Sequence, residues 1–84
     1  MPSSNTKTLA NDLVNDADQV KGLQTALKKL GYYSDKIDGK FGPNTTKAVI
    51  AFQKAAKSWY PDVGDADGRV GPKTRKAFAS HPKY

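Results

Sequence analysis

Apolar side chains recur every three or four residues along this chain of 84 residues, which is the period of one face of an α-helix. The clearest stripe predicts a helix over about residues 19–30. A second stripe begins at Pro43 and fades near Trp59, and Pro61 must end it because proline lacks the N–H that a helix needs. A last short stripe predicts a helix over about residues 72–80. The pattern therefore predicts an all-α fold, a three-helix bundle.

The ends of the chain differ in character from its middle. Residues 1–17 are small and polar apart from a weak helical signal, so we expect a short helical or disordered arm. Residues 18–80 carry the helical stripes and form the expected domain, and residues 81–84 form a tail. Asp16 or Asp18 can cap the first helix by accepting a backbone N–H.

The middle of the chain repeats itself. The segment from Val20 to Val49 aligns without a gap on the segment from Val49 to Phe78, and paired residue numbers differ by 29. Such a period indicates one supersecondary unit used twice. Each unit reads as a helix, a loop and an Asp-Gly turn that leads into the next helix. The paired positions include Gln24 and Gln53, Asp38 and Asp67, Gly39 and Gly68, Gly42 and Gly71, Pro43 and Pro72, and Thr45 and Thr74.

These repeated positions are typical of a scaffold. An aspartate bonds the backbone of its own turn, glycine tolerates positive φ, and proline fits the first turn of a helix. We therefore interpret Asp38, Gly39, Gly42, Pro43, Asp67, Gly68, Gly71 and Pro72 as structural turn residues. We expect Gly42 and Gly71 to need a backbone conformation that a β-branched residue opposes. Gln24 and Gln53 are expected to bond the loop backbone more than a ligand.

The composition limits the possible partners. The chain carries 14 Lys and Arg against 8 acidic residues, for a net charge of +6, which favours an anionic partner. The lysines are spread along the chain and form no run. No apolar stretch is long enough to span a bilayer, and the polar start MPSSNTKT is not a signal peptide. We therefore expect no membrane contact, and release by lysis or export as part of a larger system.

Catalytic chemistry finds little support in the sequence. There is one histidine, His81, there is no cysteine, and all acidic residues are aspartates. A hydrolytic metal site needs several ligands around one ion, and a glycosidase needs two carboxylates placed across a sugar. We therefore predict no catalytic residue, no metal and no cofactor, and a small hydrolase is the third and weakest reading.

The ordered set of motifs resembles the peptidoglycan-binding type 1 domain. The resemblance covers roughly residues 18–79 and implies a three-helix module that binds cell wall through a shallow groove. One departure is the loop between Gln53 and Asp67, which is longer than the family pattern. The motifs are Leu23-Gln24, Leu30-Gly31-Tyr32-Tyr33, Asp38-Gly39, Phe41-Gly42-Pro43, Thr45, Ala48-Val49, Phe52-Gln53, Asp67-Gly68, Val70-Gly71-Pro72 and Thr74.

Ligand contacts are sought where the two copies differ. Tyr32 and Tyr33 pair with Pro61 and Asp62, so we expect one tyrosine to pack and the other to lie along a sugar or stem peptide. Tyr60 occupies the position of a glycine, and Trp59 that of a core leucine. A loop aspartate and lysine could read the charged ends of a stem peptide. The candidate contacts are Tyr32, Tyr33, Asp35, Lys36, Gln53, Trp59 and Tyr60.

The function that this resemblance implies is non-catalytic binding of bacterial peptidoglycan, both stem peptide and glycan, by a monomer. Such a module targets an attached or partner wall-lytic activity to the cell wall, at an extracellular or periplasmic site. The alternative is a small basic nucleic-acid-binding helical protein. It is disfavoured because the helices that begin at Pro43 and Pro72 lack clustered Arg, Asn or Gln in their first turns.

Overall fold

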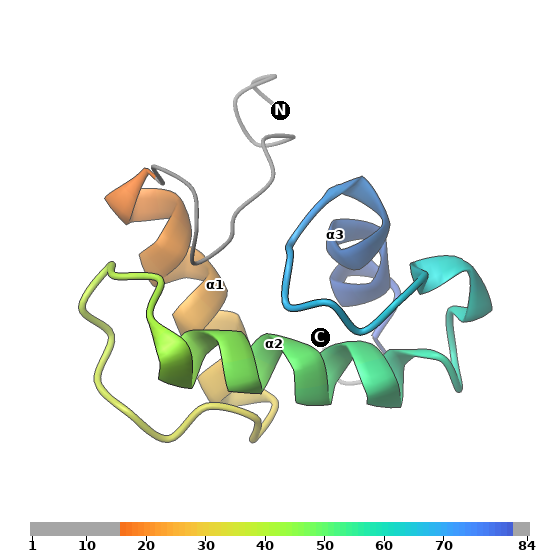
Figure 1. The fold of residues 1–84 in the computed structure, drawn as a ribbon, viewed down its shortest axis with the longest axis horizontal. Coiled ribbons are helices and arrows are strands. Elements are labelled where there is room, and N and C mark those ends of the chain that lie inside the picture. The colour runs from red at the N-terminus through yellow and green to blue at the C-terminus, as the bar shows by residue number, and fades with distance from the viewer. Residues whose placement is uncertain (1–15, 82–84) are drawn as a thin grey trace.

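The computed structural model describes residues 16–81, and the predicted N-terminal arm lies almost entirely outside them. Within this range it contains three α-helices, α1 (Ala17–Lys29), α2 (Pro43–Ala56) and α3 (Pro72–Ala79), and a 3-10 helix, η2 (Pro61–Val63). Figure 1 shows α2 running across the molecule, with α1 behind one half of it and α3 beside the other half. The all-α, three-helix prediction is confirmed.

Helix α1 begins two residues before the start, and ends one residue before the end, of the predicted range of about 19–30. The carboxylate of Asp16 accepts hydrogen bonds from the backbone N–H of Asp18, at 2.9 Å, and of Gln19, at 3.2 Å. Asp16 is therefore the N-cap, one of the two residues predicted for that role. At the other end Gly31 takes a φ of 89°, the left-handed conformation expected just past the helix.

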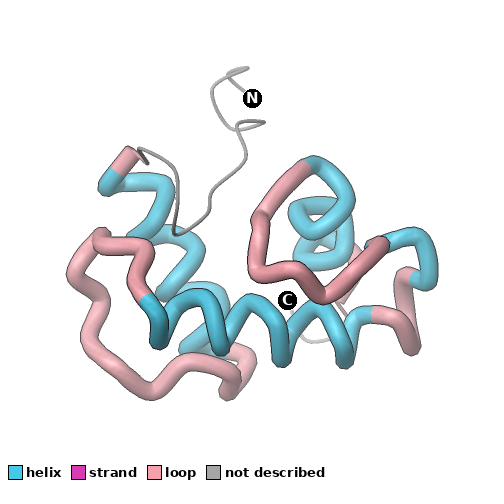
Figure 2. Tube along the Cα trace, viewed as in Figure 1, coloured by secondary structure: helices cyan, strands magenta, loops and turns pink. Residues whose placement is uncertain are grey.

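Helix α2 ends at Ala56, and the chain then makes a turn and the short helix η2 (Figure 2). The sequence predicted that Pro61 would stop a helix, but η2 also begins at this residue. Proline fits the first position of a helical turn because the N–H that it lacks has no helical partner there. Val63, at the end of η2, is buried in the core.

The expectation that Gly42 and Gly71 need the backbone freedom of glycine is wrong. Their φ angles are −108° and −101°, extended values that any residue adopts, and a Cβ added at Gly42 would meet nothing within 4 Å. The constraint falls on Gly39 and Gly68, whose φ angles are 75° and 77°. A Cβ added at Gly68 would lie 2.8 Å from the Cγ2 of Thr46. Glycine is therefore required at the Asp-Gly step of each turn.

Phe52 lies at the centre of the core and is 0% exposed, as the predicted phase of α2 requires. Its ring stacks on Phe78 of α3, with centroids 3.8 Å apart, and meets Tyr32 and Trp59 edge-on, each with centroids 5.7 Å away. One side chain of α2 thus connects the loop after α1, the turn after α2, and α3. The remaining apolar core consists of Val20, Leu23, Ala26, Leu27, Tyr33, Phe41, Ala48, Val49, Ala56, Val63, Val70 and Ala77.

Candidate functional site

Two equivalent turns frame the candidate site. In the first, the Gln24 Nε2 lies 3.0 Å from the Lys40 carbonyl oxygen and 3.1 Å from both the Thr45 Oγ1 and the Asp38 Oδ1. The Gln24 Oε1 accepts a hydrogen bond from the Gly39 N–H at 3.0 Å. A buried amide on α1 therefore satisfies the polar groups of the Asp-Gly turn that precedes α2.

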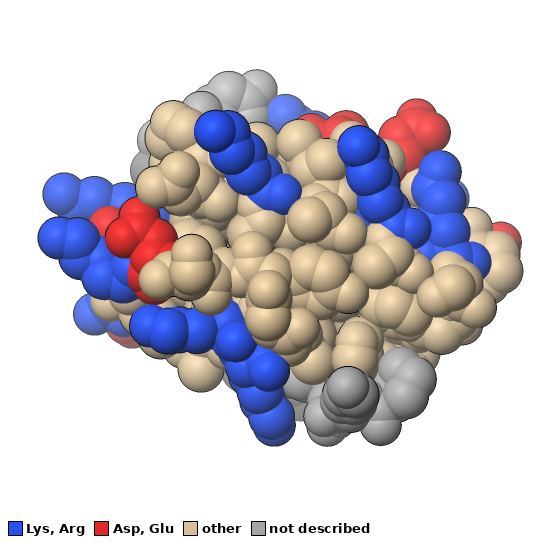
Figure 3. Space-filling view, turned by 90° about the horizontal axis from the view of Figure 1, so that it is seen from below, with Lys and Arg blue, Asp and Glu red and all other residues tan. Residues whose placement is uncertain are grey.

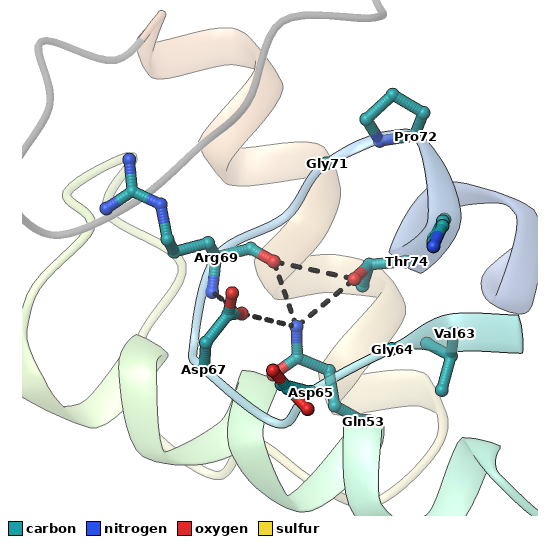
Figure 4. Close-up of a pocket in the computed structure, with 10 residues that line it drawn as sticks. Gln53, Val63, Gly64, Asp65, Asp67, Arg69, Gly71, Pro72 and Thr74 are labelled. Carbon is teal, nitrogen blue, oxygen red and sulfur yellow. Dashed lines mark hydrogen bonds between the residues drawn. The ribbon is translucent and has the colours of Figure 1, made fainter.

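The second turn repeats this arrangement on α2 (Figure 4). The Gln53 Nε2 lies 2.9 Å from the Arg69 carbonyl oxygen, 3.1 Å from the Thr74 Oγ1 and 3.2 Å from the Asp67 Oδ1. The Gly68 N–H donates to the Gln53 Oε1 at 2.9 Å. Gln53, a candidate ligand contact from the sequence, is 1% exposed and supports the turn from beneath. The interpretation of both glutamines as turn-bonding residues agrees with these contacts.

The carboxylates of the first loop are held in their charged form. The backbone N–H of Lys40 donates to Asp38 at 2.9 Å, and this bond, with a smaller effect from Gln24, lowers the pKa of Asp38 below its usual value. The Asn44 side-chain amide donates to Asp35 at 2.9 Å and is the main cause of the lowered pKa of Asp35. Because the pKa of each group is lowered, both carboxylates carry a negative charge near neutral pH, and both lie at the surface of this loop.

One of the two loop tyrosines packs, as expected, and it is Tyr33. It is 5% exposed, its hydroxyl donates to the Lys36 carbonyl oxygen at 2.6 Å, and it accepts from the Gln24 Nε2 at 3.3 Å. Burial raises the pKa of this phenol above its ordinary value. Tyr32 is half-buried, and its ring packs edge-on against Phe52. Tyr33 therefore fixes the loop, and Tyr32 is the more exposed of the two tyrosines.

A pocket of about 430 Å³, which we call the first pocket, lies between this loop and the start of α2. The hydrogen bond from Asn44 to Asp35 joins its two sides. The sequence pointed to Tyr32, Tyr33 and Asp35 but not to the α2 residues; the signal for Asn44 is that its repeat partner, Lys73, is a different residue type. The first pocket is lined by Tyr32, Tyr33, Ser34, Asp35, Asn44, Lys47 and Ala48.

A second pocket, of about 560 Å³, lies beside the Asp67 turn and the start of α3 (Figure 4). Gln53 and Thr74 contribute buried polar atoms to it, and Val63 contributes an apolar side chain. Sequence reasoning did not select this pocket, because its turn residues looked purely structural. The second pocket is lined by Gln53, Val63, Gly64, Asp65, Asp67, Arg69, Gly71, Pro72, Lys73 and Thr74.

The remaining candidates, Trp59, Tyr60 and Lys36, line neither pocket. Trp59 is half-buried, and its indole N–H donates to the Ala77 carbonyl oxygen at 2.9 Å, so it ties the turn after α2 to α3. Tyr60 is half-buried at the start of η2, and Lys36 is exposed. The ring of His81 meets Trp59 edge-on, with centroids 4.6 Å apart. Trp59 meets Phe52 edge-on, as Tyr32 does, but Trp59 does not line the first pocket.

The positive charges are dispersed. Figure 3 shows lysine and arginine side chains around the margin of one face, with an uncharged strip across its centre. Within residues 16–81 the structure holds no group of three or more His, Asp or Glu side chains that could bind a metal ion. In the same range no helix has the length and apolar character required to cross a membrane.

Comparison with known families identifies this arrangement. The family described as "Putative peptidoglycan binding domain" matches residues 16–78, which include both glutamine-bonded turns and all three α-helices but for the last residue of α3. The chain belongs to this family. The resemblance seen in the sequence motifs is thereby confirmed, and the family is one of binding domains that occur in cell-wall hydrolases.

Several curated proteins contain a segment similar to this peptidoglycan-binding domain. The chain is 39% identical over 67 residues to the spore cortex-lytic enzyme of Bacillus subtilis, covering 80% of the chain and 20% of that protein. It is 41% identical over 71 residues to the type VI secretion system spike protein VgrG3 of Vibrio cholerae, covering 76% of the chain and 7% of that protein. It is 36% identical over 62 residues to the N-acetylmuramoyl-L-alanine amidase CwlM of Mycobacterium tuberculosis, covering 73% of the chain and 14% of that protein.

The chain thus spans a fifth or less of the length of each of these relatives. No solved structure matches the chain.

Proposed function

We propose that this domain binds bacterial peptidoglycan non-covalently, without cutting it, and holds an attached or partner wall-lytic activity at the cell wall. The observation that carries the proposal is the family match across residues 16–78. Two of the relatives bear the names of wall-acting enzymes, and each contains this segment as a small part of a much longer chain. That arrangement supports a role as an accessory binding module.

We assign the main contact to the first pocket. It lies where the two copies of the repeat differ, so it can supply one specific site on a scaffold that is otherwise duplicated. Tyr32 is half-buried and lines this pocket, where its ring offers an apolar face to a sugar or a peptide. Asp35 and Lys47 line the same pocket and carry opposite charges, which suits a stem peptide with free ammonium and carboxylate groups.

Residues around the first pocket have supporting roles in this proposal. Trp59 and Tyr60 supply further aromatic contacts, and Lys36 adds positive charge on the loop. Tyr33 and Gln53 are buried, so we propose that they hold the loop and the turn without touching ligand. A monomer is sufficient for this function, because tethering raises the local concentration of an attached enzyme even when the affinity is modest.

Co-sedimentation of the pure protein with insoluble peptidoglycan tests the proposal. We expect the protein to pellet with the wall and to release no soluble fragments or new reducing ends. Tyr32→Ala should weaken binding by about 1–2 kcal/mol, or roughly five- to thirtyfold, the contribution of a partly buried aromatic contact. Lys28→Ala, which removes an exposed lysine of α1 away from both pockets, is the matched control. A steady loss of turbidity with the pure protein would show that the domain cuts wall.

A further inference from the structure

The second pocket differs from the first at the two positions that form a bridge between loop and helix. In the first copy, Asp35 and Asn44 are hydrogen-bonded to each other at 2.9 Å across the gap between loop and helix. Their partners in the repeat are Gly64, which has no side chain, and Lys73. A Cβ on Gly64 would lie 3.9 Å from the Cδ of Lys73, so the lysine stem passes over the glycine without bonding to it.

The backbone of Gly64 keeps this part of the pocket open. Its φ of 86° and ψ of −156° belong to a region that only glycine adopts readily. A side chain equivalent to Asp35 is therefore excluded at this position by backbone strain, and no bridge like that of the first copy can form. The second pocket therefore lacks the hydrogen-bonded bridge between loop and helix that spans the first pocket.

Two opposite charges line the second pocket without partners. Asp65 and Lys73 are both exposed, and neither makes a side-chain hydrogen bond or ion pair with the rest of the described chain. The other charged lining residues are committed elsewhere. Asp67 accepts hydrogen bonds from the Arg69 N–H and from Gln53, and Figure 4 shows the Arg69 guanidinium pointing away from the pocket.

We propose that the second pocket is a separate binding site for a small peptide group that carries both a free carboxylate and a free ammonium. Lys73, in the first turn of α3, holds the carboxylate, where the helix dipole also favours a negative charge. Asp65 holds the ammonium. Val63 and Pro72 supply an apolar wall for the aliphatic atoms between the two charges. The inference rests on the proposed function only for the source of this group, a peptidoglycan stem peptide; a free peptide has the same chemistry.

A soluble probe tests the site directly. The probe is Nα-acetyl-L-lysyl-D-alanine, which has a side-chain ammonium and a terminal carboxylate, titrated into the ¹⁵N-labelled protein and followed by amide chemical shifts. We expect saturable shifts at Gly64, Asp65 and Lys73. The Nε-acetylated probe and the C-terminal amide each lack one charge, and each should bind about fivefold more weakly.

Matched variants separate this pocket from general attraction between charges. Asp65→Asn and Lys73→Gln should each weaken the probe about fivefold, while Lys28→Gln, on the exposed face of α1, should leave it unchanged. The absence of saturable shifts in residues 61–75, shifts confined to the first pocket, or equal weakening by Lys28→Gln would each overturn the proposal.

Wall binding is measured in parallel with the same proteins. If the parent pellets with peptidoglycan but the probe leaves residues 61–75 unperturbed, the second site is wrong and the proposed function stands. If the probe binds at the second pocket but the parent does not pellet, the site stands and a free peptide is its ligand. Competition between probe and peptidoglycan for the parent would identify the stem peptide as the source.

Discussion

Gln24 and Gln53 each reach from a helix into one Asp-Gly turn and bond its backbone from inside the core. An unpaired polar group in such a place is costly, because no water replaces the lost partner. These two side chains therefore link the formation of each turn to the packing of the helix before it. They also explain why the repeat retains an amide at a position next to core residues.

Replacing Gln53 with leucine should destabilise the fold strongly. The volume is retained, but the Gly68 N–H and the Arg69 carbonyl lose their buried partner, at about 1–3 kcal/mol for each group left unsatisfied. Urea denaturation followed by circular dichroism gives the free energy of unfolding. Thr25→Ala, which removes an exposed side-chain bond to the Lys21 carbonyl, should have a small effect. Equal midpoints for parent and Gln53→Leu would contradict the role assigned to this amide.

Alanine substitutions at two turn glycines should differ in their effect on stability. Gly68→Ala forces a side chain onto a φ of 77° and into contact with Thr46, so it should destabilise the protein by about 1–3 kcal/mol. Gly42→Ala enters open space on an extended backbone and should stay within about 0.5 kcal/mol of the parent. The melting temperatures of the parent and of both variants, measured side by side, report the two changes in stability. A larger loss at Gly42 would show that the turn is wrongly described.

Acid should destabilise the first Asp-Gly turn. The folded-state pKa of Asp38 is lowered from 3.8, chiefly by the Lys40 backbone N–H, so its contribution is present above pH 3.8 and is lost as the pH falls through the lower folded value. Asp38→Asn should reduce the pH dependence of the melting temperature on the acid side. Parallel melting curves against pH for parent and variant would show that this carboxylate is not coupled to folding.

At the scale of the elements, Phe52 of α2 joins the two halves of the repeat. It contacts Phe78 of α3 and the rings of Tyr32 and Trp59, which come from loops on either side of α2. The turn that follows α2 is further tied to α3 by the Trp59 indole N–H. The two copies therefore share one core, and we expect them to unfold together.

Phe52→Ala should be the most damaging single change in α2. Truncating a fully buried aromatic costs about 3–5 kcal/mol, a large share of the stability of a domain this small. Thermal unfolding followed by near-UV circular dichroism measures the loss, with exposed Lys54→Ala as the control on the same helix. A variant that melts within a few degrees of the parent would mean that the core does not depend on this ring.

The sequence predicted these elements well where local chemistry decides them. The apolar period predicted α1 and α3 to within two residues and α2 to within three, and the cap at Asp16 followed from residue type. It was wrong about Gly42, because a Gly-Pro step looks like a tight turn although its backbone is extended. Within each repeated turn, the positive φ falls on the glycine of the Asp-Gly step and not on the glycine before proline.

The candidate site was less predictable because it depends on contacts between elements. Tyr32 and Tyr33 are adjacent and chemically identical in the sequence. Only the packing shows that Tyr33 turns inward to Lys36 and Gln24 while Tyr32 stays half-exposed. Tyr33→Ala is therefore not a clean test of binding, because removing a buried, hydrogen-bonded ring should also destabilise the loop. Tyr32→Ala and Tyr60→Ala are the better probes.

At the scale of the whole molecule, the charged side chains and the aromatic side chains of Tyr32 and Tyr60 should make separable contributions to binding. The lysines lie around an uncharged strip in Figure 3 and form no single basic block. Their attraction to an anionic wall should fade with added salt, because exposed charges are screened within about 8–10 Å at 0.1–0.15 M ionic strength. The contribution of Tyr32 and Tyr60 should persist.

The central claim is that the scaffold presents a specific wall-binding site, and one experiment tests it most directly. Parent, Tyr32→Ala and Tyr60→Ala are co-sedimented with purified peptidoglycan across a salt series, beside a gel shift with DNA. We predict that the parent pellets at moderate salt, that both variants bind more weakly while keeping cooperative unfolding, and that DNA binding vanishes as salt rises. If both variants bind the wall as tightly as the parent, and charge reversal of surface lysines alone abolishes binding, adhesion is electrostatic and the claim is contradicted.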